Sequence, residues 1–211
     1  MDNNKQIGKV VCKHLVKSEA EMNRPADYMR LFSEIDGFLS KGSVIVAIDG
    51  GSASGKTTLA SKLQEVYDCN VFHMDDFFLQ AHQRTPERLN EVGGNVDRER
   101  FQSEVLQSLK KGETVYYRRF DCQTQALEVP VTVEPKKLTI IEGAYSMHPA
   151  FSNYYDLGVF LDIDPEHQKQ RILKRNSTAM AERFFGEWIP MENTYFSETK
   201  IKDRCDLIIN V

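Results

Sequence analysis

The sequence has few cysteines and no long apolar segment. Its four cysteines form no C-x-x-C pair and are widely separated, at Cys12, Cys69, Cys122 and Cys205. This spacing disfavours a zinc site or a disulfide framework and favours a reducing, cytoplasmic location. The purely apolar runs reach about five residues, whereas a membrane span needs about 20. The N-terminal residues also lack the apolar stretch of a signal peptide. We therefore expect no membrane association.

A strongly basic block is also absent. The net charge is −4, which argues against nucleic acid as the main partner. No Asn-Lys-x-Asp element is present to recognise guanine, so a GTPase switch is disfavoured. The length of 211 residues and the 41% hydrophobic content suffice for one full core with a small appended subdomain. A homo-oligomer is compatible with the sequence.

What the chain does contain is a phosphate-binding motif. Residues 50–57 match G-x-x-x-x-G-K-[ST], in which glycines let backbone N–H groups turn toward a polyphosphate. Lys56 is expected to hold the β- and γ-phosphates, and Thr57 to hold Mg²⁺. The predicted nucleotide-binding residues are Gly50, Gly51, Ser52, Ala53, Ser54, Gly55, Lys56, Thr57 and Thr58. A glycine-rich structural turn is the alternative interpretation.

The neighbouring sequence favours the phosphate loop. Residues 44–48 form a short β-branched run, as expected of a buried parallel strand. Leu59, Leu63 and Val66 then recur at helical spacing. Strand, glycine-rich loop and helix follow one another in the order that the motif requires.

The whole chain alternates strands with helices. Further strands are expected at residues 70–74, 138–141, 157–161 and 207–209, and helices over 28–39, over 101–109 and after Asp164. This alternation predicts an α/β fold: a three-layer α/β/α P-loop NTPase with a five-stranded parallel sheet. Residues 1–43 are predicted to form a helical extension and residues 44–211 the main domain. That domain includes a long loop at 80–96, a substrate arm at about 112–134 and a helical lid at about 171–190, while residues 7–18 fit helix or strand.

Acidic residues gather where predicted strands end. Asp49, Asp75, Asp76 and Glu142 all fall at or just past such ends, where ligands of parallel sheets bind. A carboxylate there can hold Mg²⁺ or accept a proton, although turn-forming acids are common anywhere. Beside the phosphate loop, we favour functional roles for Asp75 and Glu142, with Glu142 near the metal.

Basic residues mark the predicted lid. Arg171 and Arg175 are spaced i, i+4 and so share a helix face, with Lys174 and Arg183 nearby. Arginines that close onto phosphates can accelerate phosphoryl transfer by about 10³–10⁵-fold. A solvated basic helix face is the alternative interpretation.

At these residues the chain resembles the uridine kinase family of small P-loop kinases, which is related to nicotinamide riboside kinases, phosphoribulokinases and bacterial-type pantothenate kinases. The resemblance begins near Val44 and extends to the end of the chain. Its motifs are Gly50–Thr57, His73–Phe78, Asn95–Asp97, Ile141–Gly143, the helix with Arg171 and Arg175, and Asp206–Ile209.

The resemblance implies a role for several of these side chains. Asp75 matches the acid beside the 5′-hydroxyl, which makes it the expected base. Asp97 matches an acid that bonds the ribose hydroxyls, although it could equally cap the helix that follows. Glu142 matches the acid near Mg²⁺, and Arg171 and Arg175 match lid arginines. The expected catalytic residues are therefore Lys56, Asp75, Arg171 and Arg175.

One departure concerns base recognition. Uridine kinases recognise the pyrimidine partly with Tyr and His in a segment similar to Tyr-Asp-Phe-x-x-His, whereas residues 120–125 here are Phe-Asp-Cys-Gln-Thr-Gln. The tyrosine hydroxyl is missing, and Gln125 stands in place of the histidine. Arg119 in the arm could meet an anionic substrate or could be an exposed hairpin charge, as could Arg118. The expected substrate residues are Asp75, Asp97, Phe78, Phe120, Gln125 and Arg119.

The sequence thus predicts an ATP- and Mg²⁺-dependent kinase of a small hydroxylated acceptor. Its resemblance favours the 5′-hydroxyl of a nucleoside or ribosyl compound. Alternatives are a kinase for nicotinamide riboside, a phosphosugar or a pantothenate-like alcohol, and a regulatory module that binds ATP without transferring its phosphate. A P-loop ATPase is disfavoured because the third strand ends in Glu142-Gly143 rather than in an Asp-Glu pair.

Overall fold

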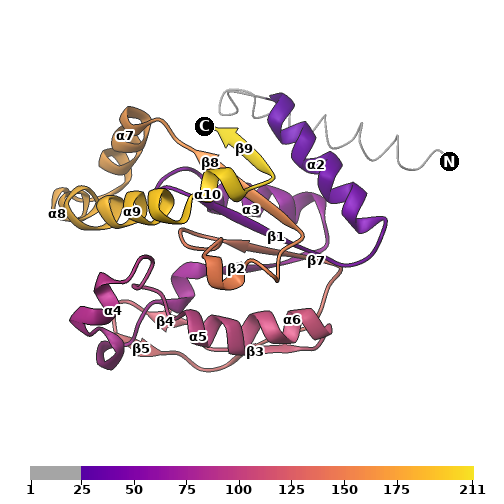
Figure 1. Ribbon diagram of the computed structural model, residues 1–211, viewed down its shortest axis with the longest axis horizontal. Helices are drawn as coiled ribbons and strands as arrows, with labels where there is room; N and C mark the ends of the chain where they lie inside the picture. The colour runs from indigo at the N-terminus through magenta and orange to yellow at the C-terminus, as the bar shows by residue number, and fades with distance from the viewer. Residues whose placement is uncertain (1–24) are drawn as a thin grey trace.

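A central parallel sheet organises the molecule. The structure, a computed structural model, describes residues 25–211. Its largest sheet has the strand order β2-β7-β1-β8-β9, and each neighbouring pair is parallel. The strands are β1 (Val44–Gly50), β2 (Cys69–His73), β7 (Leu138–Glu142), β8 (Leu157–Asp162) and β9 (Leu207–Asn210). Figure 1 shows helices on both sides of this sheet, which confirms the predicted three-layer α/β/α fold with five strands.

The central strands are apolar because both faces of the sheet are covered. β7 is buried along its whole length, and β1 is buried except for partly exposed Ile45. β1 lies between β7 and β8, with Ile48 opposite Glu142 and Gly50 opposite Leu161. The loop after β1 therefore leaves the middle of the sheet, beside the carboxyl end of β7.

One face of the sheet is covered by α2 (Pro25–Leu39) and α3 (Lys56–Val66). Leu31 of α2 and Leu63 of α3 are fully buried in one cluster with side chains of β1, β7, β8 and β9. Burying a leucine side chain contributes about 1.5–3 kcal/mol. The two helices confirm those expected from the periodicity, whereas residues 7–18 lie outside the described residues and the domain boundary at residue 43 stays a prediction.

The other face carries two groups of helices. α5 (Arg98–Phe101) continues through a π-helical turn, Gln102–Leu106, into α6 (Gln107–Lys111). Its apolar side chains pack with Phe72 of β2 and Ile141 of β7. The C-terminal helices α9 (Ile189–Thr199) and α10 (Ile201–Arg204) cover the rest of this face.

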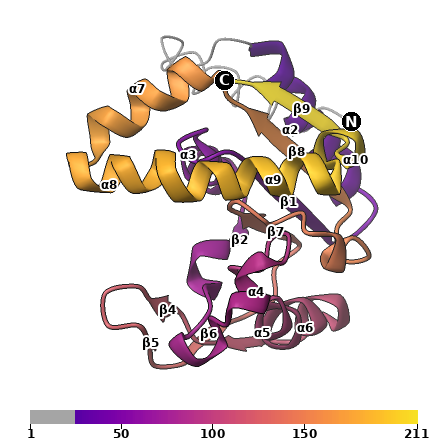
Figure 2. The same cartoon turned by 60° about the vertical axis from the view of Figure 1, so that its left-hand side comes forward.

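Short antiparallel ladders form the predicted arm. β3 (Val115–Tyr117) pairs with β6 (Val131–Val133), and β4 (Phe120–Asp121) pairs with β5 (Ala126–Leu127). The structure thus has two consecutive ladders where a hairpin or protruding arm was expected. Figure 2 shows them in the lower part of the molecule, on the far side of the sheet from α2.

The segment between β2 and α5 contains more helix than the sequence predicted. A 3₁₀ turn at Met74–Phe77 is followed by another at Ala81–Gln83 and by α4 (Pro86–Asn90). The expectation of a long loop over 80–96 is therefore partly wrong. The physical reason is local capping: Thr85 accepts a hydrogen bond from the backbone N–H of Arg88, and Pro86 stands in the first turn of α4.

The predicted lid consists of helices near the C-terminus. α7 (Pro165–Arg175) is the helix expected after Asp164, and the Asp164 side chain caps it by accepting a hydrogen bond of 2.9 Å from the N–H of Glu166. α8 (Thr178–Arg183) continues through the π-helical residues Phe184–Trp188 directly into α9. Among the described residues, the helices are all too short or too polar to cross a bilayer.

Candidate active site

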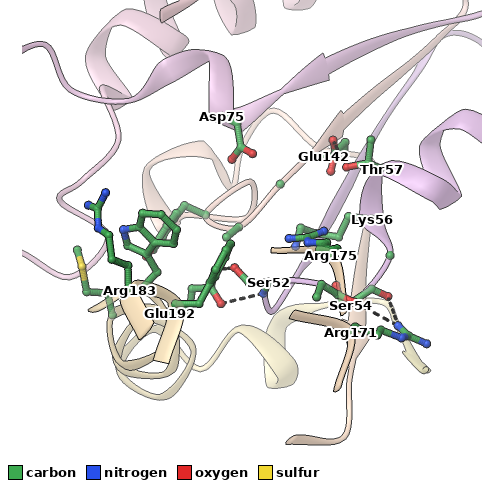
Figure 3. A pocket seen from close by; sticks show the side chains of 18 of the residues that line it. Ser52, Ser54, Lys56, Thr57, Asp75, Glu142, Arg171, Arg175, Arg183 and Glu192 are labelled. Carbon is green, nitrogen blue, oxygen red and sulfur yellow. Dashed lines mark hydrogen bonds between the residues drawn. The ribbon is translucent and has the colours of Figure 1, made fainter. Parts of the chain in front are cut away.

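A cleft of about 1810 Å³ opens at the carboxyl edge of the sheet. Residues of the phosphate loop, of the predicted lid, of the arm and of the segment after β2 all line it. Pockets for one small ligand usually measure about 300–1,000 Å³. This cleft is therefore large enough for a nucleotide and a second small molecule together. Figure 3 shows side chains that line it, with the principal ones labelled.

The phosphate loop has the backbone that its motif requires. Gly50 has a φ of 144° and Gly55 a φ of 99°, angles that side-chain-bearing residues avoid. At Gly50 a Cβ would also lie 2.5 Å from the carbonyl oxygen of Leu161 on the neighbouring strand. Lys56 Nζ donates to the carbonyls of Gly50 and Gly51 at 2.8 and 2.9 Å, so the ammonium lies across the loop.

Oxygen ligands that suit Mg²⁺ meet beside this loop. Thr57 Oγ1 donates to Glu142 Oε1 at 3.0 Å, although the two residues are 85 positions apart in the chain. Mg²⁺ prefers hard oxygen ligands and is commonly held by one or two side chains together with substrate phosphates. The hydroxyl and the buried carboxylate therefore fit the ion. The buried Ser54 Oγ, which has no hydrogen-bond partner within residues 25–211, adds a polar group that a phosphate could bond.

His73, the last residue of β2, adds a titratable group beside Glu142. Its Nδ1 lies 2.6 Å from Glu142 Oε1. This contact is the main cause of a raised pKa for His73, and burial acts in the opposite direction. A protonated His73 would compete with any cation for the Glu142 carboxylate.

Asp75 faces the cleft from the 3₁₀ turn after β2. Its side chain lines the cleft wall, on the far side of the phosphate loop from Arg171 in Figure 3. Asp75 is exposed to the cleft, but the protein around it partly desolvates the carboxyl and raises its pKa; the positive charge of Lys56 lowers the pKa and the negative charge of Glu142 raises it. Such a group is placed to orient or deprotonate a hydroxyl.

The three arginines of the predicted lid make different contacts from one another. Arg171 Nη1 donates to the carbonyl of Ala53 at 3.2 Å and so contacts the outside of the phosphate loop. Arg175 stacks over the ring of Phe184 at 5.7 Å, and its charge lowers the pKa of Asp75. Arg183 lies 4.8 Å from the Trp188 ring. All three arginines line the cleft.

Of the expected acceptor residues, Phe78, Phe120 and Gln125 line the cleft together with Asp75. Gln125 has a φ of 56° and donates from Nε2 to the Cys122 carbonyl at 2.7 Å. This hydrogen bond holds its carboxamide against the arm. The side of the cleft opposite the lid is therefore partly aromatic and carries amide groups.

Two other expected acceptor residues are not among the described residues that line the cleft. Asp97 is buried, accepts from Gln83 Nε2 at 2.9 Å and from the backbone N–H of Arg100 at 3.1 Å, and so is the N-cap of α5. Arg119 Nε lies 3.5 Å from Asp76 Oδ2, which places both charges in a local pair. Of the two roles weighed for Asp97, the cap is present, while contact with an acceptor stays a prediction.

Several cleft residues carried no assigned role in the sequence analysis. Glu192 accepts hydrogen bonds from Ser52, and Asn95 Oδ1 is buried without a hydrogen-bond partner among the described residues. Arg84 adds a cation to the lining of the cleft. Asn95 lies in a motif that was recognised, whereas no sequence pattern marks Glu192 or Arg84.

Asp49 lies at the carboxyl end of β1, as expected, but it is not among the described residues that line the cleft. Its carboxylate is fully buried and accepts from the backbone N–H groups of Gly50 at 2.7 Å and Met147 at 2.9 Å. It also accepts from the Tyr195 hydroxyl at 2.8 Å. Burial raises its pKa to about 6, against the lowering effect of these bonds. Asp49 thus stabilises the base of the phosphate loop and does not line the cleft.

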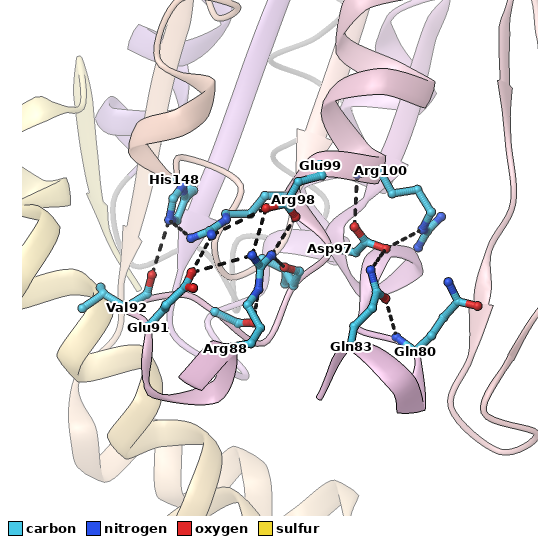
Figure 4. Close-up of polar contacts among 12 residues, drawn as sticks. Gln80, Gln83, Arg88, Glu91, Val92, Asp97, Arg98, Glu99, Arg100 and His148 are labelled. Atoms are coloured by element: carbon cyan, nitrogen blue, oxygen red, sulfur yellow. Dashed lines mark hydrogen bonds and ion pairs between the residues drawn. The ribbon is translucent and has the colours of Figure 1, made fainter. Parts of the chain in front are cut away.

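An ion-pair network supports the segment between β2 and α5 (Figure 4). Arg88 donates from Nε to the Gly94 carbonyl at 3.0 Å and from Nη2 to the Val96 carbonyl at 2.9 Å. Its guanidinium also makes two bonds to Glu99, of 2.9 and 2.8 Å. A planar guanidinium with several partners restricts the backbone well. Arg88 therefore holds the segment that presents Asn95 to the cleft.

The fold and the phosphate loop together define a P-loop nucleotide-binding protein. The model of the phosphoribulokinase / uridine kinase family matches residues 45–183, and the chain belongs to this family. Since its named relatives are kinases, the chain is by class an ATP-dependent small-molecule kinase.

Individual relatives agree with this family. Uridine kinase from Macrococcus caseolyticus is 27% identical over 176 residues, which are 75% of this chain and 84% of the relative. Phosphoribulokinase from Synechocystis sp. is 27% identical over 148 residues, which are 66% of this chain but only 43% of the relative. A solved structure of a possible uridine kinase from Bacillus stearothermophilus has a TM-score of 0.61 at 21% identity, covering 85% of this chain and 99% of that one, and so shares its fold.

Proposed function

We propose that this protein transfers the γ-phosphoryl group of ATP to the 5′-hydroxyl of a nucleoside or another ribosyl compound. The observation that carries the proposal is that one cleft contains the phosphate loop, the Thr57–Glu142 pair and the Asp75 carboxylate. Phosphoryl transfer depends on holding donor, metal and acceptor in line and on neutralising the charge that develops. These groups supply each of those requirements.

In the proposed reaction, Lys56 and the loop N–H groups bind the phosphates, and Thr57 and Glu142 would hold Mg²⁺. The ion, when bound, would neutralise negative charge on the phosphates. Asp75 accepts or orients the proton of the acceptor hydroxyl, as its position on the opposite wall allows. Arg175, which already acts on the charge of Asp75, would stabilise the transferring group.

The acceptor side supports a ribosyl compound but also favours a second candidate. Phe78 and Phe120 offer surfaces for a flat ring, and Asn95 offers to a hydroxyl an amide oxygen that has no hydrogen-bond partner within residues 25–211. Gln125, however, stands where the related kinases have a histidine. A different hydroxylated acceptor that is not a riboside, such as a phosphosugar or a pantothenate-like alcohol, is therefore the second candidate.

The test is ADP production with Mg-ATP across a panel of acceptors. The panel contains pyrimidine and purine nucleosides, nicotinamide riboside, ribulose 5-phosphate and pantothenate, with a control that has no acceptor. Release that depends on a nucleoside or ribosyl compound supports the proposal. Release with another acceptor identifies the second candidate, and equal release with and without acceptors contradicts both in favour of an ATPase.

A further inference from the structure

A carboxylate from the C-terminal helix is bonded directly to the phosphate loop. Glu192 of α9 accepts from the backbone N–H of Ser52 at 2.8 Å and from the Ser52 hydroxyl at 2.5 Å (Figure 3). Its side chain is 4% exposed. Burying an ionised carboxylate is costly unless donors hold it, and Ser52 supplies two. The contact therefore defines the position of Ser52 with respect to α9.

A second side chain of the same helix reaches the strand that leads into this loop. Tyr195 is fully buried, and its hydroxyl donates to Asp49 Oδ2 at 2.8 Å. Because Glu192 and Tyr195 are three residues apart on α9, they project from one face of the helix. This face is consequently attached to the chain on both sides of Gly50 and Gly51.

The helix with these two attachments also bears lid residues. α8, the π-helical turn at Phe184–Trp188 and α9 follow without a break, and Arg183 is the last residue of α8. The Phe184 ring, at the start of the π-helical turn, lies under the guanidinium of Arg175. Any change in how α9 sits on the phosphate loop would thus be transmitted to the cations above the cleft.

We propose that Glu192 and Tyr195 are positioning residues that attach the lid to the phosphate loop and set the distance between the lid arginines and the transferring phosphoryl group. This proposal rests on the proposed kinase function. The two residues act through Ser52 and Asp49 rather than on the substrates. Arginine contacts count chiefly in the transition state, so loss of the attachment lowers kcat more than it raises KM.

The central experiment compares Glu192→Ala with the unchanged protein. We expect kcat to fall by about tenfold to 100-fold while the KM for ATP changes by less than about threefold. Glu198→Ala is the matched control, since Glu198 lies on the same helix with an exposed side chain, and it should keep kcat within about twofold. An unchanged kcat in Glu192→Ala contradicts the proposal.

The conservative variant separates positioning from charge. In Glu192→Gln, the carboxamide can accept from the Ser52 N–H and donate to the Ser52 hydroxyl, so kcat should stay within about threefold of the unchanged protein. Tyr195→Phe removes one hydroxyl from a buried ring and should lower kcat by about threefold to tenfold. A Glu192→Gln variant as impaired as Glu192→Ala would overturn the positioning role.

A double-mutant cycle tests whether the attachment acts through the lid. If it does, Glu192→Ala should reduce kcat much less when Arg175 is already alanine, because the positioned cation is gone. Fully additive losses would show that Glu192 works independently of Arg175 and would overturn this part of the proposal.

Amide hydrogen exchange tests the attachment without any acceptor. Glu192→Ala should increase exchange at residues 50–57 and 184–199 together, whereas Glu198→Ala should not. If the protein phosphorylates none of the acceptors but this paired increase occurs, the attachment stands and the proposed function fails. If the protein is an active kinase and the two segments do not respond, the attachment is refuted and the function stands.

Discussion

The two sides of the cleft are built differently. On the donor side, a loop between a fully buried strand end and a helix carries the phosphate-binding groups, and its first glycine, Gly50, lies tightly against the neighbouring strand. On the acceptor side, strands of two or three residues and short helical turns carry aromatic and amide side chains. The donor side thus depends on backbone geometry, whereas the acceptor side depends on individual side chains.

Because of this difference, side chains can be exchanged more freely on the acceptor side than on the donor side. Every polyphosphate presents the same oxygens, so one backbone arrangement serves all members of a fold. Acceptors differ in shape and in hydrogen-bonding groups, and short ladders allow side chains to be exchanged without disturbing the core. We therefore expect changes on the donor side to abolish transfer to every acceptor, and changes on the acceptor side to alter which acceptor is used.

The largest effect is expected from Lys56→Met. The variant removes the ammonium that spans the phosphate loop, and kcat/KM should fall by about 10³-fold with any acceptor. Steady-state kinetics with two different acceptors measure this loss. Lys137→Met, at an exposed lysine, is the matched control and should remain active. A loss confined to one acceptor would contradict a donor-side role for Lys56.

Asp75→Asn should have the next largest effect. The carboxamide keeps the shape of the side chain but cannot accept the proton of the hydroxyl, so kcat should fall by about 10²-fold or more. ATP binding, measured by calorimetry, should stay nearly intact. Asp76→Asn changes the neighbouring acid, which pairs with Arg119, and should alter kcat by less than about threefold. Near-normal turnover of Asp75→Asn would remove Asp75 from the mechanism.

The sequence predicted the donor side better than the acceptor side, because the donor side depends on one backbone segment and the acceptor side on separate side chains. The phosphate loop is one contiguous segment, and its flanking strand and helix show clear apolar periodicity, so its position at the sheet edge could be inferred. Thr57 and Glu142 could be brought together because adjacent parallel strands end at one edge. Glu192 could not be inferred, because its contact with Ser52 depends on how α9 packs 140 residues further along the chain.

The acceptor side contains contacts that the sequence did not predict. The motif around Asp97 was recognised, but whether its carboxylate faces a substrate or the backbone depends on the neighbouring Gln83 and Arg100. The helical turns between residues 80 and 96 depend on local caps at polar residues, which periodicity does not detect. Arg88, Gly94 and Glu99 form a network whose members are too irregularly spaced to be grouped from sequence.

Arg88→Ala tests that network as an acceptor-side support. The variant releases the carbonyls of Gly94 and Val96, so the KM for the acceptor should rise by about tenfold while the KM for ATP stays within about twofold. Initial rates with each substrate varied in turn separate the two constants. Arg30→Ala, at an exposed arginine of α2, is the control. Equal changes in both constants would contradict the division between the two sides.

Gln125→His should change selectivity by a smaller factor. Histidine adopts the positive φ of this position more readily than most residues, and it restores the ring that related kinases carry there. One altered hydrogen bond discriminates between acceptors by about threefold to tenfold. The ratio of kcat/KM for uridine to that for adenosine should therefore rise, with the KM for ATP unchanged. A constant ratio would show that Gln125 does not contact the base.

The smallest expected effect is a displacement of the pH profile of kcat/KM, which we assign to Asp75. Loss of water raises the pKa of this carboxyl, so the ionised form that accepts a proton is present above the raised pKa and is lost as the pH falls through it. kcat/KM for the acceptor should accordingly decline at a higher pH than an ordinary aspartate, with a pKa of about 3.9, would give. Rates measured from about pH 4 to 8 reveal this limb, and Asp75→Asn should lack it. A limb that persists in Asp75→Asn would belong to the nucleotide or to another carboxylate, and the division of roles between the two sides would have to be redrawn.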